Sequence, residues 1–153
     1  MTALDDSLDQ LGTLTARNGG RGCYLVLMPE YRPDISKAFA QRLGLEMFDY
    51  RAEVMAPYGM EAHKIPLADL TDRLQQETAH TGILAHNVEA LLATKPETER
   101  RKWLSDCLLA DWPQPLLLVL SIFPDDAPTE SGRVLDLRDL DFEDQSLISR
   151  LLH

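Results

Sequence analysis

The 153-residue chain lacks any long uncharged apolar run, and its first residues lack the features of an export signal. A helix that crosses a bilayer needs roughly 20 consecutive apolar residues, and no stretch approaches this length. Residues 1–7 contain neither a basic region nor an apolar core, so they do not resemble a signal peptide. We therefore expect a cytoplasmic protein with no membrane association.

Cysteine is also scarce, and the spacing of the metal-ligating residue types is uninformative. Cys23 and Cys107 are the two cysteines, and each lies in an apolar stretch, so both are expected to be buried free thiols. His63 and His80 have glutamates nearby in the sequence, but they lack the short regular spacing of zinc ligands. The sequence therefore predicts no metal site around these residues.

Cations are fewer than acids, with 15 Lys and Arg against 25 Asp and Glu, which gives a net charge of −10. The average field of such a protein repels a phosphate backbone, so direct DNA binding is disfavoured unless a local basic patch overrides it. Acids concentrate near the C-terminal end. This acidic segment is either solvated surface or a docking surface for a basic partner protein, for which the candidate residues are Asp136, Asp139, Asp141 and Asp144.

The elements that are present alternate between buried strands and amphipathic helices. Apolar residues make up 44% of the chain, enough for one folded domain over residues 1–153. Within it, residues 1–20 are expected to form a helix and a flexible break, and 124–153 an acidic C-terminal segment. We expect strands at 23–28, 45–50, 82–86, 116–121 and 134–137. We expect helices at 4–16, 35–43, 67–79, 97–110 and 141–152, and a short helical piece that ends near residue 92. The pattern of residues 51–66 gives no assignment. This alternation predicts a mostly parallel α/β sheet with helices on both faces.

The order of the expected elements resembles that of a P-loop NTPase, which would be a three-layer sandwich. A strand leads into a loop and a helix, a later strand ends in polar residues, and another ends in a small polar residue. Carboxyl ends of parallel strands meet at one edge, where such folds bind ligands. The candidate residues of a vestigial nucleotide edge are Ser36, Lys37, Glu89 and Ser121.

The residues that would bind phosphate are wrong for that chemistry. A Walker A loop reads Gly-x-x-x-x-Gly-Lys-[Ser/Thr], where glycines let amides surround phosphate and the lysine supplies charge. Aligning Ser36 with the final hydroxyl puts Ile35 at the lysine, Asp34 at the second glycine and Pro29 at the first. Asp34 instead suits the N-cap of the following helix. We therefore expect no bound nucleotide and no cofactor.

The strand that would carry the Walker B acids is altered in the same way. His86 stands where an aspartate would face magnesium, and imidazole is a poor magnesium ligand. Glu89 retains a carboxylate where a catalytic one would lie, and Ser121 matches a sensor-type polar residue. The alternative interpretation is that these side chains are polar ends of strands with no chemical role.

Residues 22–121 resemble the small P-loop proteins of bacterial BREX phage-defence systems, the family called BrxF. The best-matching part is 82–92, where the family has an apolar run, then Asp-Asn-Ile-Glu, then more apolar residues. The resemblance implies the P-loop frame, an antiviral defence setting and partners in a multi-protein system. It does not carry over ATP hydrolysis, because the family's lysine and aspartate have no match here.

Three functions from different classes follow from these observations. The first is a non-catalytic subunit or adaptor that acts through protein contacts, and the second is an ATPase subunit completed by a partner chain. The third is a metal-dependent nucleic-acid enzyme with a site drawn from Asp125, Asp126, Glu30 and Glu89, although the sequence has no Glu-x-Lys or Asp-x-Lys pattern after a strand. The basic cluster at 99–103 is expected to be a solvated helix face.

Overall fold

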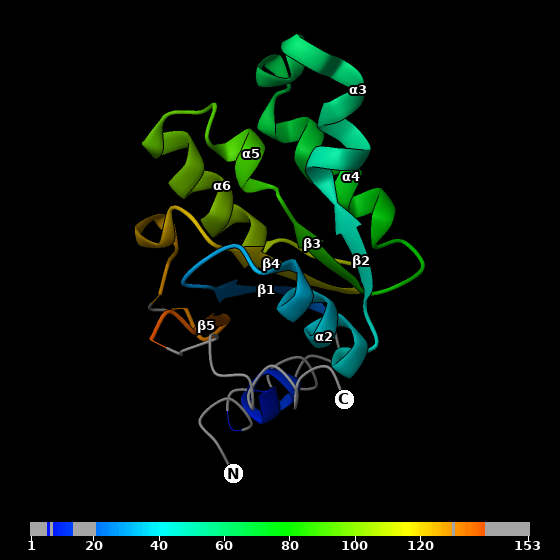
Figure 1. The fold of residues 1–153 in the computed structure, drawn as a ribbon, viewed down its shortest axis with the longest axis vertical. Helices are drawn as coiled ribbons and strands as arrows, with labels where there is room; N and C mark the ends of the chain where they lie inside the picture. The colour runs from blue at the N-terminus through cyan, green and yellow to red at the C-terminus, as the bar shows by residue number, and fades with distance from the viewer. Residues whose placement is uncertain (1–5, 7, 14–20, 130, 140–153) are drawn as a thin grey trace.

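A five-stranded parallel sheet forms the centre of the computed structural model, which describes residues 6, 8–13, 21–129 and 131–139 (Figure 1). The strands lie in the order β2-β3-β4-β1-β5, and every pair is parallel. Their bounds are β1 Gly22–Leu27, β2 Glu46–Asp49, β3 Ile83–His86, β4 Pro115–Leu120 and β5 Val134–Asp136. The predicted parallel sheet is confirmed, and each strand lies within two residues of its expected limits.

The central strands are apolar, apart from His86 at the end of β3, because both of their faces are covered. Every residue of β1 and of β3 is buried. Leu118 in β4 lies opposite Leu25 of β1 on one side and Ala85 of β3 on the other. A strand buried on both faces is a continuous apolar run without alternation, and such runs identified these strands in the sequence.

Helices cover the two faces of the sheet, which gives the three-layer α/β arrangement that the sequence predicted. On one face, α2 (Pro33–Leu43) and the helical residues 8–13 pack against Tyr24, Val26 and Leu117. On the other, the core is formed by α4 (Leu67–Glu77), α5 (Glu89–Leu92) and α6 (Glu97–Leu109). Among the described helices, none is long and apolar enough to cross a membrane.

The segment that sequence patterns left unassigned is helical and projects beyond the end of β2 (Figure 1). It consists of a π-helical turn η1 (Arg51–Met55), the short α3 (Ala56–Tyr58) and a 3-10 turn η2 (Gly59–Lys64). Pro57 lies in the first turn of α3, where its missing amide hydrogen costs nothing, so it does not break the segment. We call residues 51–64 the helical lobe, and none of them is buried.

The start and end of α2 show which local signals were interpreted correctly. Gly44 ends the helix with φ 69°, a left-handed conformation that favours glycine, as predicted. The predicted N-cap is wrong, because the helix begins at Pro33 and Arg32 takes the N-cap position. Asp34 lies inside the first turn. The helix expected at 141–152 lies outside the described residues.

Candidate functional site

The loops that leave β1, β3 and β4 meet at the carboxyl edge of the sheet, where parallel α/β folds bind ligands. Two non-glycine residues in these loops have left-handed backbone conformations. Asn87, directly after β3, has φ 62°, and Phe123, after β4, has φ 57°. Such conformations are uncommon outside glycine and persist where the surrounding contacts hold them. Asparagine adopts this conformation comparatively readily, so the bulky Phe123 is the more unusual of the two.

Asn87 joins the ends of three strands. Its amide nitrogen Nδ2 donates to Oδ1 of Asp49 at 3.0 Å and to the hydroxyl of Tyr31 at 3.2 Å. The same oxygen of Asp49 accepts from the backbone amide of Ala52 at 3.1 Å. Burial raises the pKa of Asp49, but the hydrogen bonds from Asn87 and Ala52 outweigh it and leave that pKa lowered. Asp49 is therefore a fixed, ionised anchor of this edge.

His86 lies beneath Tyr31 and is held in its neutral form. Its side chain is buried, and its ring stacks on that of Tyr31 with the centroids 6.5 Å apart. Burial lowers the pKa of His86, while the charges of Asp49 and Glu89 oppose that shift without cancelling it. The nitrogen Nδ1 is buried and has no hydrogen-bond partner within the described residues. A neutral imidazole in this place does not substitute for a magnesium-binding aspartate.

Glu89 and Ser121 are the two predicted edge residues that the structure brings together. The oxygen Oε2 of Glu89 accepts from the amide of Ser121 at 2.8 Å and from its hydroxyl at 3.1 Å. The other oxygen, Oε1, is buried and has no partner in the described part of the chain. Ser36 is buried within α2 and Lys37 lies on its exposed side, and no described hydrogen bond joins either to this pair.

The loop that corresponds in sequence to a Walker A phosphate loop contains ion pairs between its own side chains. Nε and Nη2 of Arg32 donate to the two carboxylate oxygens of Asp34 at 3.1 and 3.0 Å. Nη1 of Arg32 lies 3.4 Å from a carboxylate oxygen of Glu30. The hydrogen bond from Arg32 is the largest cause that lowers the pKa of Asp34. The carboxylate of Asp34 thus serves an ion pair at the start of α2 rather than the N-cap role that the sequence suggested.

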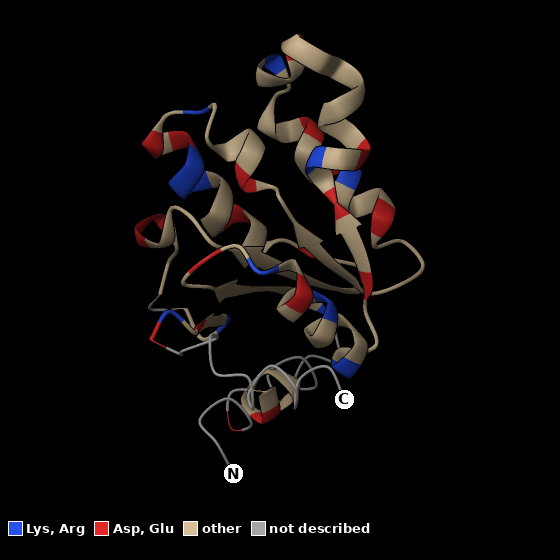
Figure 2. Ribbon diagram, in the orientation of Figure 1, with Lys and Arg blue, Asp and Glu red and all other residues tan. Residues whose placement is uncertain are grey.

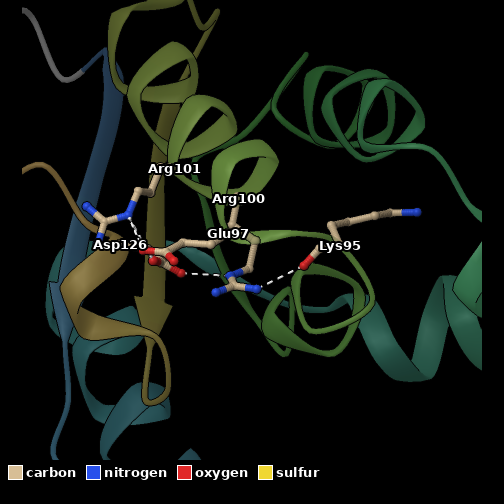
Figure 3. A network of polar contacts seen from close by, with 5 residues as sticks. All are labelled: Lys95, Glu97, Arg100, Arg101 and Asp126. Carbon is tan, nitrogen blue, oxygen red and sulfur yellow. Dashed lines mark hydrogen bonds and ion pairs between the residues drawn. The ribbon is translucent and has the colours of Figure 1, made fainter.

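The basic cluster at the start of α6 binds an acid of the turn η3 (Pro124–Asp126), as Figure 3 shows. Nε of Arg100 lies 2.7 Å from Oδ2 of the buried Asp126, and Nε of Arg101 lies 3.4 Å from Oδ1. In Figure 2 the blue turn of α6 lies beside the red turn η3. The interpretation of this cluster as a solvated face is wrong for Arg100.

The same contacts weaken the case for a metal-dependent enzyme. Asp126 is committed to two arginines, while its neighbour Asp125 is exposed to solvent. Within the described ranges, no group of three or more His, Cys, Asp or Glu side chains is placed to hold a metal ion. The proposed nuclease-like cluster of Glu30, Glu89 and the Asp125–Asp126 pair is therefore not assembled there.

The acidic docking candidates are only partly described. Asp136 ends β5 and accepts hydrogen bonds from Nε and Nη2 of Arg138 at 2.9 and 2.6 Å. These bonds are the main reason that the pKa of Asp136 is lowered. Asp139 is exposed, whereas Asp141 and Asp144 lie outside the described residues. A docking role for the acidic segment stays a prediction.

The two cysteines are buried and free, as expected, and they touch. The Sγ atoms of Cys23 in β1 and Cys107 in α6 lie 3.4 Å apart. Burial is the largest cause that raises the pKa of the Cys23 thiol. Their sequence separation of 84 residues gave no signal of this contact.

Replacing His86 by Phe should remove part of the pH dependence of stability. The pKa of folded His86 is lowered, whereas in the unfolded chain it is about 6.5. At a pH between the lowered pKa of the folded state and the pKa of the unfolded state, the unfolded chain binds more protons at His86 than the folded protein does. The free energy of unfolding therefore falls as the pH drops below about 7. Urea denaturation at pH 7.5, 6.5 and 5.5 should show a smaller loss for His86→Phe than for wild type. His80→Asn, at an exposed position, is the control, and identical slopes for wild type and His86→Phe would contradict this account.

Comparison with known proteins adds no family to this description. No protein-family model and no curated protein sequence matches the chain. The contacts at the carboxyl edge are therefore the basis on which a function can be assigned.

Proposed function

We propose that this protein is a non-catalytic, P-loop-like subunit or adaptor of a bacterial multi-protein system, and that it acts through contacts with other proteins. The observation that carries the proposal is the ion-pair cluster of Arg32, Asp34 and Glu30 at the start of α2. This is the place that a triphosphate occupies in a working P-loop site. Antiviral defence is the setting that the resemblance to the BrxF family implies.

The charges and the backbone at the start of α2 disfavour the binding of a nucleotide. A helix N-terminus ordinarily attracts anions through its free amides and its dipole. Here Asp34 supplies a negative charge inside the first turn, and Pro33 lacks an amide hydrogen. Arg32 donates to Asp34 through two nitrogens, so its charge is already paired. A triphosphate would have to displace this pair and approach two carboxylates.

Exposed apolar side chains favour a role in protein contacts. Tyr31 and Ile122 are both exposed in loops at the carboxyl edge, where a partner would cover them. In the helical lobe, Tyr58 is 54% exposed and Met60 is 93% exposed. Single exposed apolar residues are ordinary, but aromatic and methionine side chains are the types enriched in the centres of protein interfaces.

We predict that the isolated protein does not bind ATP tightly. Isothermal titration calorimetry with ATP and magnesium should give no dissociation constant below about 1 mM, where binding energy falls to roughly 4 kcal/mol. A partner recovered by affinity capture would then test the adaptor role directly. A micromolar dissociation constant for ATP and magnesium would overturn the proposal.

One observation favours the second function, an ATPase subunit completed by a partner chain. Glu89 keeps a carboxylate at the edge, oriented by Ser121, with one oxygen unpartnered within the described residues. A partner that supplied the missing cation and metal ligand would give this carboxylate a water to orient. ATP hydrolysis that appears only in the complex, and is lost in Glu89→Gln, would favour this function over the adaptor.

A further inference from the structure

A pocket of about 300 Å³ lies between the helical lobe and α4, and its lining residues are not those of the Glu89–Ser121 pair. The two elements lie side by side in Figure 1. The lining includes Tyr50, which directly follows β2, and Val54 and Tyr58 of the lobe. From α4 it includes Asp69, Asp72 and Arg73. The volume is at the low end for ligand pockets and suits one long side chain rather than a large cofactor.

Tyr50 is one of the lining residues, and its hydroxyl has no partner within the described residues. The side chain is fully buried, and its hydroxyl oxygen makes no hydrogen bond within the described residues. Buried tyrosine hydroxyls are ordinarily hydrogen-bonded, so this one is an unused acceptor and donor. Burial, followed by the charge of Asp69, raises the pKa of Tyr50 to about 12, so the phenol is neutral at physiological pH. A neutral phenol oxygen accepts hydrogen bonds from a cationic group.

Two carboxylates give the pocket its charge. Asp69 and Asp72 are three residues apart on α4, so they lie on the same exposed face of the helix. The cation among the lining residues, Arg73, acts electrostatically on Tyr50, but its charge is already paired with an acid. Its Nε lies 2.9 Å from a carboxylate oxygen of Glu77, and its guanidinium lies 5.4 Å from the centroid of the Phe48 ring. The lining thus combines two acids, an aromatic ring from Tyr58 and an unpartnered hydroxyl.

We propose that this pocket binds the basic side chain, lysine or arginine, of a partner protein. The cationic head would donate hydrogen bonds to Asp69, Asp72 and the Tyr50 hydroxyl, which are charge-assisted in the case of the carboxylates. The ring of Tyr58 offers a cation–π contact. A protein partner, rather than a free amine, accounts for the exposed Tyr58 and Met60 on the same lobe, which a polypeptide would cover. The claim that the occupant belongs to a protein rests on the proposed adaptor function. The claim that the pocket binds a cationic side chain does not depend on that function.

The test uses capped tripeptides titrated into the ¹⁵N-labelled full-length chain and followed by NMR. Gly-Lys-Gly and Gly-Arg-Gly should shift the amides around Tyr50, Asp69 and Asp72, and the neutral analogue with norleucine at the centre should not. The double variant Asp69→Asn/Asp72→Asn should bind the basic peptides at least about tenfold more weakly, as expected for loss of charge-assisted hydrogen bonds. Tyr50→Phe should also weaken binding while it keeps the wild-type melting temperature, because it removes only the unpartnered hydroxyl.

A second double variant, Asp106→Asn/Asp111→Asn, changes net charge equally at acids that do not line this pocket and should bind like wild type. Equal binding of the norleucine peptide, no binding of either basic peptide, or unchanged affinity in Asp69→Asn/Asp72→Asn would each overturn the proposal. Affinity capture separates this idea from the adaptor function. If wild type and Asp69→Asn/Asp72→Asn capture the same partner equally, the pocket is not the docking site and the adaptor function still stands.

Discussion

Leu118→Asp is expected to abolish the folded state. Leu118 is fully buried in β4, in the middle of the sheet, with Leu25 and Ala85 as its neighbours in the adjoining strands. A carboxylate there would be surrounded by apolar side chains with no partner, and burying such a charge costs several kcal/mol or more. The whole folding free energy of a domain of this size is about 5–15 kcal/mol. Circular dichroism should show no cooperative thermal transition for this variant.

Leu109→Asp provides the matched control, because it makes the same chemical change at a surface site. Leu109 is the last residue of α6 and is 85% exposed. The new charge would stay in water, and its unfavourable interaction with the helix C-terminus is worth at most about 1 kcal/mol. This variant should melt close to wild type. A folded Leu118→Asp with an unchanged melting temperature would show that β4 does not lie at the centre of the sheet.

The sheet and its layers were predictable because burial on both faces leaves a signature in the chain itself. The leucine run of β4 and the apolar residues of β1 needed no knowledge of their neighbours to be recognised as buried strands. The sequence placed Glu89 and Ser121 at the same edge, because both follow parallel strands and match a Walker B carboxylate and a sensor-type residue. It did not predict the hydrogen bonds that join them.

The remaining contacts of the site could not be predicted because they join residues that are distant in the sequence. Asn87 reaches back 38 residues to Asp49 and 56 residues to Tyr31, and no local pattern encodes either bond. The helical lobe was missed for a different reason. Residues 51–66 received no assignment, because Pro57 and Gly59 ordinarily interrupt a helix, although a proline in the first turn of a helix is tolerated. With the lobe unassigned, the pocket that it forms with α4 could not be anticipated either.

Arg100 has the second large expected effect, because it is the main partner of a buried carboxylate. Its Nε lies 2.7 Å from Oδ2 of Asp126, and its Nη1 donates to the carbonyl of Lys95 at 2.9 Å. Its guanidinium also lies 4.2 Å from the centroid of the Phe123 ring. Arg100→Met keeps most of the apolar stem but removes the charge, so Asp126 is left buried without its closest cation. Breaking a buried pair from one side costs about 3–5 kcal/mol, and the free energy of unfolding from urea denaturation should fall by roughly the lower figure.

Arg101→Met is the control for this ion pair, since it removes a neighbouring arginine that contributes less. Arg101 is half exposed, lies 3.4 Å from Asp126 and is also paired with Glu97 at 2.8 Å, so its loss should cost less than about 1 kcal/mol. The double variant Arg100→Met/Asp126→Leu should recover part of the stability lost in Arg100→Met, because it removes the stranded charge together with its partner. Equal losses for the two arginines, or a double variant no more stable than Arg100→Met, would mean that Asp126 is solvated and that η3 is held against α6 by apolar contacts alone.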